Sequence, residues 1–448
     1  MILRLNSMAW YRQGWPAYLG IFLVALGLRL GYEALVGNAA LENADSPAYE
    51  DLATKIALLQ PYQTERSAGA GGFPPDLQRP PGYPAFLAAI NLPARTVSRH
   101  WTSIAQCFIS AAFATVLAWL VGRMSPPGVG LLAGCLYATE WVTIVYTPML
   151  ISEPIYTVTL AMAVFTFALA LSRQSNPLSL AAGLLLGLAA VVKPAAQAIM
   201  VAFLVAWLCS KARRSAPLFL ITYLACVTPW MMRNQHKYGD FTLSEMGTVD
   251  LYFYIAKGSL HSYPPGDLEG SRINADVDAL NREWLSSTLS PTQRSRRMKQ
   301  EAAATIAGHW PAVLRQSAIG LLRTSLGTAS ITAAHSLDVP PGRVSRILLN
   351  VLPGIQILLL WGLAIAGCFA GFALRREIRI LLAASIICVL LPAASTLAQS
   401  RFRVPAIPEI CVLAAAGAAA LGRRMGQTKY RQALARTLLS FFFVRSLI

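Results

Sequence analysis

The chain has 448 residues, of which 55% are hydrophobic and 13% are charged, and its mean hydropathy is +0.49. A soluble protein of this length would form about three domains and carry about a quarter charged residues. The composition therefore excludes an ordinary soluble protein and predicts an all-α, polytopic membrane protein.

Apolar runs of the length of a transmembrane helix, about twenty residues, recur along the sequence. The first run is long and contains Arg29 and Glu33, so we expect an uncleaved anchor rather than a signal peptide. Lys193-Pro194 predicts a tight turn at the membrane surface between two short runs. In all we predict about ten spans, near 16–36, 101–122, 128–146, 150–171, 178–193, 195–210, 216–232, 351–373, 379–398 and 404–421.

The basic residues set the orientation of these spans. With the amino terminus inside, the cytoplasmic segments contain a single acid, Glu377. This is a strong positive-inside bias. This distribution explains most of the net charge of +17 without a nucleic-acid partner. The cytoplasmic cations are Arg4, Arg12, Arg123, Arg173, Lys211, Arg213, Arg214, Arg375, Arg376 and Arg379, followed by a basic tail over 422–448.

This orientation places two large segments, about 37–100 and 233–350, outside the cytoplasm. Both mix acidic and basic residues, and both contain weakly apolar helical stretches near 82–92 and 302–330 that we expect to lie on the membrane surface. Residues 1–421 thus read as a single transmembrane domain with extracytoplasmic juxtamembrane helices.

The first outer segment begins with an acidic cluster around Asp45. Ser46-Pro47 is a typical helix start, with Ser46 as the expected N-cap, so Asp45 lies where the helix dipole keeps a carboxylate ionised. Asp45 is therefore either a capping residue or a general base at the water–membrane boundary. The nearby Glu42 leaves the choice of base open.

A stiff arginine follows in the same segment. In Arg79-Pro80-Pro81 the two prolines favour an extended backbone, which would present the guanidinium rather than leave it mobile. Arg79 is either an anchor in the lipid headgroups or a bidentate ligand for a phosphate.

Other polar residues lie at the predicted outer ends of spans. Each alone is more typical of a surface anchor or an end cap. Together with Arg79 they place cations from four separate loops on one membrane face, as a site for an anionic lipid headgroup requires. They are Glu153 in "LISEPIY", Lys193 in "VVKPA", Arg233 and Asn234 in "TPWMMRNQHKYGDF", and Arg401 and Arg403 in "QSRFRVPAIPE".

Six stretches occur in order at hydrophobic boundaries: "ADSPAYEDLA", "RPPGYPAFLAA", "YTPMLISEPIY", "AAVVKPAA", "TPWMMRNQHKYGDF" and "RFRVPAIPEICVLAA". Over about residues 16–421 they resemble bacterial GT-C-type glycosyltransferases, in the family that includes protein O-mannosyltransferases and aminoarabinose transferase. The resemblance implies a polyprenyl-phosphate sugar donor and an active site on the extracytoplasmic face of the bacterial inner membrane. The chain departs from larger members in lacking further carboxy-terminal spans and a soluble outer domain.

The resemblance also implies roles for individual residues. Asp45 matches the catalytic acid of the family, and Arg79 matches the basic residue that contacts the lipid phosphate. Glu153 matches an acid whose role is less defined. Tyr49, Tyr83 and Asn234 are further candidates for binding substrate.

No cofactor is expected. The five histidines are scattered, and the seven cysteines lie in apolar runs as expected core residues, without a CxxC pair. The sequence contains no HExxH, Walker A or GxGxxG motif. Asp276-Val277-Asp278 is a DxD of the kind that binds a metal and a nucleotide sugar, but it falls in an outer loop, where nucleotide sugars are not available.

These observations predict a hexosyl- or pentosyltransferase that moves a sugar from a polyprenyl-phosphate donor to a lipid, glycan or protein acceptor. Asp45 would be the base, and Arg79, Arg233, Lys193, Arg401 and Arg403 would bind the donor phosphate. One alternative is a polymerase or ligase that uses a lipid-diphosphate glycan. Another is a transporter or flippase for an anionic lipid, which we disfavour because the mid-span regions look bare of charge.

Overall fold

The computed structural model describes residues 7–37, 41–42, 44–63, 69–93, 96–126, 128–210, 217–260, 279–339, 342, 345 and 347–425. Every regular element within them is helical. Five helical segments in this part of the chain are long and apolar enough to cross a membrane: Gly14–Leu35, Arg99–Gly122, Glu153–Arg173, Ile347–Cys368 and Ser400–Arg423. The protein is thus a helical, multi-pass membrane protein, and the predicted number of ten spans stays a prediction. Most of the predicted basic tail lies outside the described residues.

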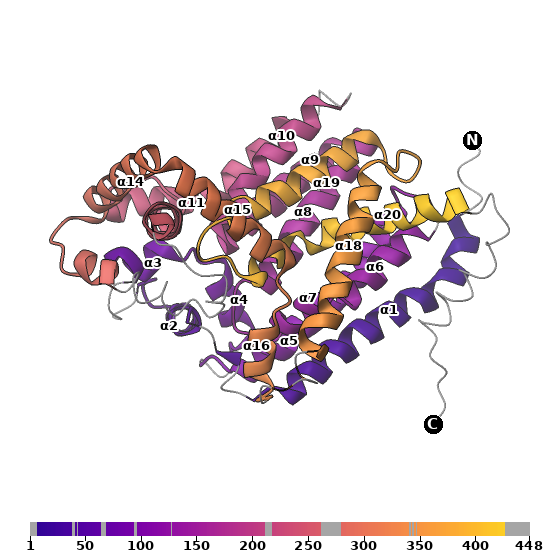
Figure 1. Ribbon diagram of the computed structural model, residues 1–448, viewed down its shortest axis with the longest axis horizontal. Helices are drawn as coiled ribbons and strands as arrows, with labels where there is room; N and C mark the ends of the chain where they lie inside the picture. The colour runs from indigo at the N-terminus through magenta and orange to yellow at the C-terminus, as the bar shows by residue number, and fades with distance from the viewer. Residues whose placement is uncertain are drawn as a thin grey trace.

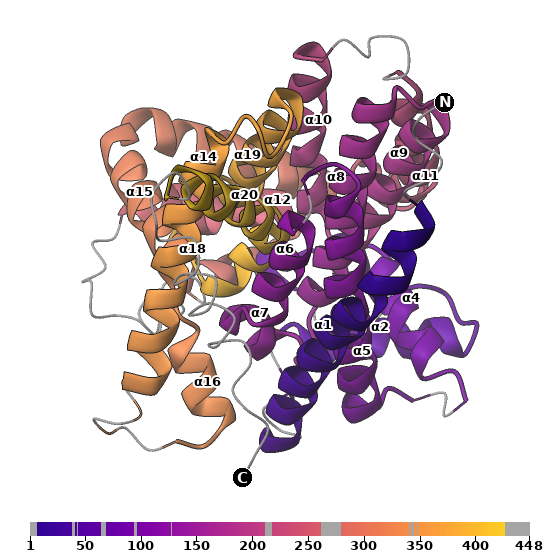
Figure 2. The same cartoon turned by 90° about the vertical axis from the view of Figure 1, so that its right-hand side faces the viewer.

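The long helices form one bundle around α8 (Glu153–Arg173), as Figures 1 and 2 show. The side chains of α8 are mostly buried. α8 packs between α5 (Arg99–Gly122) and α9 (Asn176–Val192). The other pairs are α1 (Ser7–Leu35) with α5 and α6 (Val129–Ala138), α11 (Pro217–Tyr238) with α9, α10 (Ile199–Leu208) with α19 (Arg376–Leu390), and α18 (Leu352–Cys368) with α20 (Ile407–Met425).

Shorter helices from the two predicted outer segments gather near the end of the bundle where α5 and α8 begin (Figure 1). The stretch near 82–92 forms α4, as predicted, whereas the stretch near 302–330 is broken at His309 into two helices. The bounds are α2 (Ser46–Ala57), α3 (Pro75–Gln78), α4 (Gly82–Ile90), α12 (Met246–Val249), η4 (Asp250–Lys257), α14 (Pro291–Gly308), α15 (Trp310–Leu326) and α16 (Ser330–Ser336).

Three expectations need correction or refinement. The run near 128–146 is not one helix, because it ends at Ala138 and restarts as α7 (Trp141–Tyr146), where the carboxylate of Glu140 caps the amide of Thr143 at 2.6 Å. The break between α9 and α10 lies at Lys193, as predicted, and is followed by the 3-10 turn η3 (Pro194–Ala198). Cys209 is exposed rather than a core residue.

The expectation that the middle of the spans is bare of ionisable groups is wrong for the last span. Glu409 lies inside the candidate span Ser400–Arg423 and is fully buried, and neither carboxylate oxygen has a hydrogen-bond partner among the described residues. Arg29 is also fully buried, donating to Ser110 Oγ at 2.9 Å and to the carbonyl of Ala138 at 3.0 Å. Bare spans therefore cannot be used against a transporter.

Glycine allows a close contact between α18 and α20. A Cβ added at Gly367 would collide with the backbone carbonyl of Leu413, and one added at Gly417 would collide with the carbonyl of Leu363. Small residues that let two backbones approach in this way are a common basis of helix association in membranes. Gly362, also on α18, has no atom within 4 Å of the same added Cβ.

This contrast predicts different outcomes for one substitution at two positions of α18. Gly367→Ala must push α20 away and should cost about 1–3 kcal/mol of stability, as overpacking does. Gly362→Ala meets open space and should be neutral or slightly stabilising, because alanine favours a helix. Thermal unfolding of both variants in detergent measures the difference, and equal melting temperatures would contradict the packing.

Candidate active site

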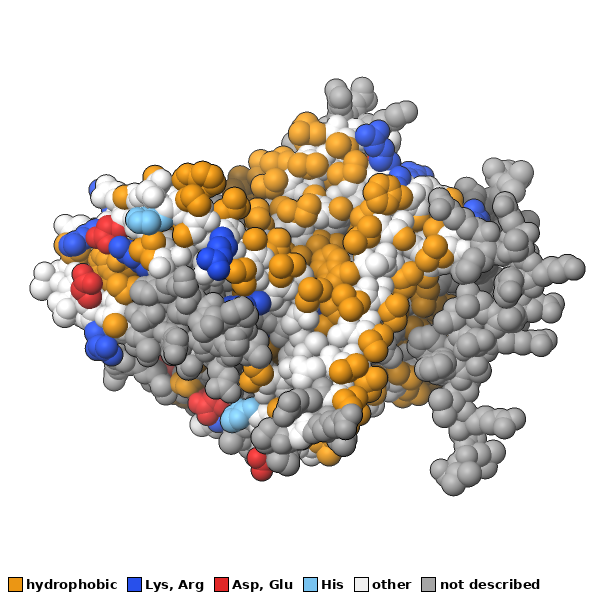
Figure 3. All heavy atoms as spheres, in the orientation of Figure 1, with side chains coloured by type: hydrophobic (Ala, Val, Ile, Leu, Met, Phe, Trp, Pro, Cys, Tyr) orange, Lys and Arg blue, Asp and Glu red, His pale blue; other side chains and the backbone are white. Residues whose placement is uncertain are grey.

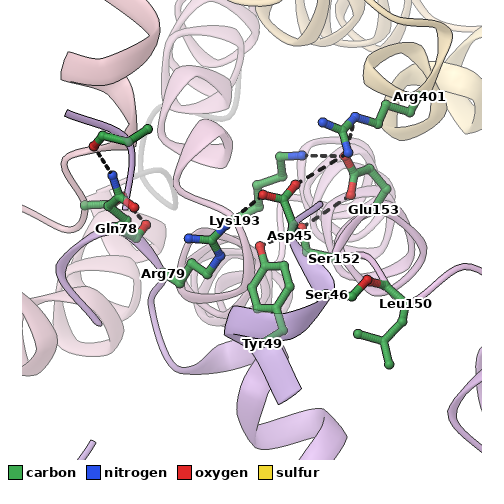
Figure 4. A network of polar contacts seen from close by, with 12 residues as sticks. Asp45, Ser46, Tyr49, Gln78, Arg79, Leu150, Ser152, Glu153, Lys193 and Arg401 are labelled. Carbon is green, nitrogen blue, oxygen red and sulfur yellow. Dashed lines mark hydrogen bonds and ion pairs between the residues drawn. The ribbon is translucent and has the colours of Figure 1, made fainter. Parts of the chain in front are cut away.

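The carboxylate of Asp45 lies between two arginines from distant parts of the chain (Figure 4). Arg79 Nη2 donates to Asp45 Oδ1 at 2.7 Å, and Arg401 Nη1 lies 3.5 Å from Asp45 Oδ2. The arginine side chains are only 13% and 11% exposed, whereas the Asp45 side chain is 36% exposed. Asp45 is thus the part of this group that water or a ligand reaches most easily.

Asp45 occupies the N-cap position of α2, but its side chain makes no capping hydrogen bond. Ser46, which the sequence predicted as the N-cap, is instead the first helical residue and donates from Oγ to the carbonyl of Leu150 at 2.8 Å. That bond ties the start of α2 to the segment just before α8. The geometry therefore removes capping as the reason for Asp45.

A second ion pair adjoins the first. Lys193, where α9 ends, places its Nζ 2.9 Å from Glu153 Oε1, and Glu153 is the first residue of α8. Arg401 Nε lies 3.8 Å from the same Glu153 oxygen, so Arg401 faces both carboxylates. Figure 4 shows these side chains converging from α8, from the end of α9 and from the segment before α20.

We name Asp45, Arg79, Glu153, Lys193 and Arg401 the Asp45 cluster. Its three cations stand against two carboxylates, which leaves one positive charge in excess. Burial alone would raise the pKa of Asp45, but the charges of Arg401, Arg79 and Lys193 outweigh it and hold that pKa below its usual value. The cluster can therefore accept one further anion while Asp45 stays ionised.

Arg79 is held by its backbone and by aromatic rings. Its backbone is extended, as the following prolines predicted, and its carbonyl accepts a hydrogen bond from the Tyr62 hydroxyl at 2.9 Å. The guanidinium carbon lies 5.2 Å from the ring centroid of Tyr49. Arg79 Nε is buried and has no hydrogen-bond partner among the described residues, so a ligand oxygen could take this donor.

The two candidate tyrosines differ in their surroundings. The Tyr49 hydroxyl, 3.4 Å from Ser152 Oγ, adjoins the Asp45 cluster. Tyr83 is fully buried behind Tyr49, with an edge-to-face ring contact at 4.8 Å, and its hydroxyl donates to Gln106 at 2.9 Å. Tyr83 supports Tyr49 in this arrangement and is itself out of contact with solvent.

Arg233 and Asn234 do not join the Asp45 cluster. Arg233 binds Asp76 at 2.5 Å and the carbonyl of Tyr62 at 2.9 Å, in a group that also includes Lys237. Asn234 is fully buried between Arg233 and the carbonyl of Thr242. Tyr62 links the two groups, because its carbonyl binds Arg233 and its hydroxyl binds the Arg79 carbonyl.

Arg403 and Glu42 also lie apart from the Asp45 cluster. Arg403 is 1% exposed and donates to the carbonyls of Thr324, Ser325 and Gly327 at 2.7–3.0 Å. Glu42 is bound by Arg99 at 2.9 Å, and Arg99 also binds Glu50. The contacts of Arg403 and Glu42 join segments of the chain at the outer end of the bundle.

Asp250, the first residue of η4, was not anticipated from the sequence. Burial raises its pKa to about 6, and the remaining influences on it come from Lys193, Asp45 and Arg401, which places it beside the cluster. No motif surrounds Asp250. It lies beside the Asp45 cluster because the second outer segment folds back onto the bundle. It adds a carboxyl that changes charge near neutral pH.

The described residues contain no group of three or more His, Cys, Asp and Glu side chains that could hold a metal ion. Asp276 and Asp278, the acids of the DxD, lie outside the part of the chain that the structure describes. What the site presents is a charged, partly open group of arginine, lysine and carboxylate side chains.

No protein-family model matches this sequence, and no curated protein resembles it significantly in sequence. Solved structures do resemble the fold. The oligosaccharyltransferase AglB of Archaeoglobus fulgidus, solved with an inhibitory peptide and a dolichol-phosphate, superposes with a TM-score of 0.56 at 12% identity, over 98% of this chain and 53% of AglB. An Archaeoglobus fulgidus oligosaccharyltransferase tethered by a disulfide bond to an acceptor peptide containing the NVT sequon gives a TM-score of 0.57 at 12% identity, over 96% of this chain and 54% of that protein.

The likeness bears on fold, because at 12% identity the sequences share little else. The chain spans about half the length of the solved proteins it matches. AglB is a GT-C-fold glycosyltransferase, so the expected fold is supported, whereas membership of the superfamily and placement among O-mannosyltransferases or aminoarabinose transferases stay predictions. This protein thus has a GT-C-like fold.

Proposed function

We propose that the protein is a membrane glycosyltransferase that moves a sugar from a polyprenyl-phosphate donor to an acceptor outside the cytoplasm. The observation that carries the proposal is the Asp45 cluster, in which three cations stand against two carboxylates and leave one positive charge in excess while the neighbouring Asp250 is neutral. In such a site the cations can bind a phosphate oxygen, and the carboxylate can accept the proton of an acceptor hydroxyl.

The chemistry is a single displacement at the anomeric carbon. Asp45 takes the proton of the acceptor hydroxyl as its oxygen bonds to that carbon, and the bond between the carbon and the phosphate oxygen breaks. The departing polyprenyl phosphate gains one negative charge. Arg79, Arg401 and Lys193 stabilise this charge, which exists in the transition state and not in the bound donor.

The resting ion pairs explain how Asp45 gains basicity only when the donor is present. Without a donor, Arg79 and Arg401 lower the pKa of Asp45, which makes it a weak base. A bound phosphate competes for the same guanidinium groups and adds a negative charge nearby. Both effects raise the pKa of Asp45 towards the range in which a general base works well.

The structural neighbours support this chemistry without fixing the donor. AglB is an oligosaccharyltransferase solved with an inhibitory peptide and a dolichol-phosphate, and the second neighbouring oligosaccharyltransferase is tethered to an acceptor peptide. A peptide acceptor and a lipid-diphosphate glycan donor are thus the second candidates for this chain, after a simple polyprenyl-phosphate sugar. The orientation of the site away from the cytoplasm rests on the positive-inside pattern of the sequence, and the bacterial inner membrane rests on the resemblance to bacterial GT-C-type enzymes.

The role of Asp45 is tested by Asp45→Asn, which keeps the size of the side chain and loses the charge and the basicity. We expect turnover to fall about a hundredfold or more. The melting temperature, measured beside it, should also fall, because Arg79 and Arg401 lose a charged partner. The matched control is Glu42→Gln, which removes a nearby carboxylate bound to Arg99 and should leave turnover near normal. Full activity of Asp45→Asn together with an inactive Glu42→Gln would show that the base has been misassigned.

The role of Arg79 is tested by a graded pair. Arg79→Lys keeps the charge but not the planar fork, and Arg79→Ala loses both. We expect the alanine variant to lose on the order of a hundredfold in turnover and the lysine variant to lie between. Arg99→Ala, which removes an ion-paired arginine from the same end of the bundle, is the control and should have a small effect. If Arg79 were only an anchor in the lipid headgroups, Arg79→Lys would leave turnover unchanged.

Asp250 predicts a pH dependence of donor binding. Its pKa of about 6 means that it is neutral below pH 6 and negative above it. The negative form cancels the excess positive charge of the cluster, so the KM for a donor phosphodiester should rise roughly threefold or more between pH 6 and pH 8. Asp250→Asn should hold the KM low and flat across this range. The same rise in both proteins would show that Asp250 does not face the donor.

A further inference from the structure

A second basic site lies at the other end of the bundle. A pocket of about 260 Å³ opens between the end of α5, the end of α8 and the turn that joins α18 to α19. Arg123 and Arg375 line it, together with the hydroxyl-bearing Ser125 and Ser172, and none of its lining residues is acidic. Nothing in the proposed reaction uses this pocket.

Four arginines surround the pocket. Arg375 donates to the carbonyl of Ser172 at 3.2 Å, and the guanidinium carbon of Arg123 lies 4.4 Å from the ring centroid of Trp119. Arg379 Nη2 lies 3.6 Å from where a Cβ would stand on the lining residue Gly371. Arg423 stacks on the lining residue Phe372 at 4.1 Å. These contacts keep the four arginines around the pocket.

The pocket also contains an unused hydrogen-bonding group. Ser172 Oγ is buried and has no hydrogen-bond partner among the described residues. Buried hydroxyls are normally paired, because leaving one unpaired is costly. A ligand oxygen in the pocket would supply the partner that the chain does not.

Two helices connect this pocket to the Asp45 cluster and fix the distance between them. α8 runs from Glu153 in the cluster to Ser172 in the pocket, and its 21 residues span about 30 Å at 1.5 Å per residue, the thickness of a hydrocarbon core. The candidate span Ser400–Arg423 likewise begins beside Arg401 and ends at Arg423. The two basic sites therefore lie at opposite membrane surfaces.

The surroundings of the pocket fit a lipid better than a free anion. Phe372, which lines it, is 40% exposed, and Phe369 at the end of α18 is 81% exposed. Figure 3 shows a broad hydrophobic face leading towards this end, with acidic side chains on that face confined to the left and lower edge. Exposed aromatic side chains beside arginines match acyl chains joined to a phosphate.

We propose that this pocket binds the phosphate of an anionic phospholipid headgroup, with Arg123 and Arg375 as its main ligands and Ser172 Oγ as a further donor. The lipid would occupy the leaflet opposite the Asp45 cluster. This site is independent of the transferase proposal, since no residue of the cluster takes part in it.

The test is native mass spectrometry of the full chain in detergent, titrated with phosphatidylglycerol or phosphatidylcholine. The wild type should bind phosphatidylglycerol roughly tenfold more tightly or better, since each arginine near a membrane surface adds substantially to anionic-lipid affinity. The Arg123→Gln/Arg375→Gln double variant should lose this preference. The matched control, Arg173→Gln/Arg376→Gln, removes two exposed arginines that do not line the pocket and should retain it.

Three outcomes would overturn the proposal: no phosphatidylglycerol preference in the wild type, equal losses in the pocket and control double variants, or inorganic phosphate competing as well as the lipid. The last result would assign the pocket to a free anion. Melting curves in phosphatidylcholine check folding. If the double variant does not fold, Arg123→Gln alone changes an exposed side chain and should still reduce the preference severalfold.

Discussion

The feature on which the site depends is the sharing of Arg401 between two carboxylates. Arg401 lies 3.5 Å from Asp45 and 3.8 Å from Glu153, so it joins the first outer segment to the start of α8, and Lys193 extends the link to the end of α9. Ion pairs this buried are costly unless they are mutually satisfied. The same pairs that fix these segments also leave one positive charge at a partly open position. Structure and proposed chemistry thus rest on one charge arrangement.

Part of this arrangement could be predicted from the sequence. Asp45 and Arg79 lie in the same predicted outer segment, and the prolines after Arg79 predicted its extended backbone, but their contact is seen only in the structure. Hydropathy could not tell which polar residues at the outer ends of the spans belong to the site. It placed Arg233, Asn234 and Arg403 in the same position as Lys193 and Arg401. Only packing shows that Asp76 and backbone carbonyls bind Arg233 and Arg403. Asp250 reaches the site through a long segment that carries no motif.

The fold was more predictable than the details of its helices. A low charge fraction and long apolar runs specify a helical membrane protein, because the bilayer requires every backbone group to be paired within a helix. Breaks such as those at Glu140 and Lys193 depend on local side chains, and they shorten runs that a hydropathy window reads as continuous. Glu409 could be seen in the predicted span 404–421, but only the structure shows that it is fully buried without a hydrogen-bond partner among the described residues.

The central claim is that the phosphate of a polyprenyl lipid binds at the Asp45 cluster. The most direct measurement is an experimental structure of the protein with polyprenyl phosphate, the product of the proposed reaction. We expect phosphate density within hydrogen-bonding distance of Arg79 and Arg401, with the Asp45–Arg79 contact lengthened beyond its present 2.7 Å. Phosphate bound beside Arg233 and Lys237, with the Asp45 ion pairs unchanged, would contradict it.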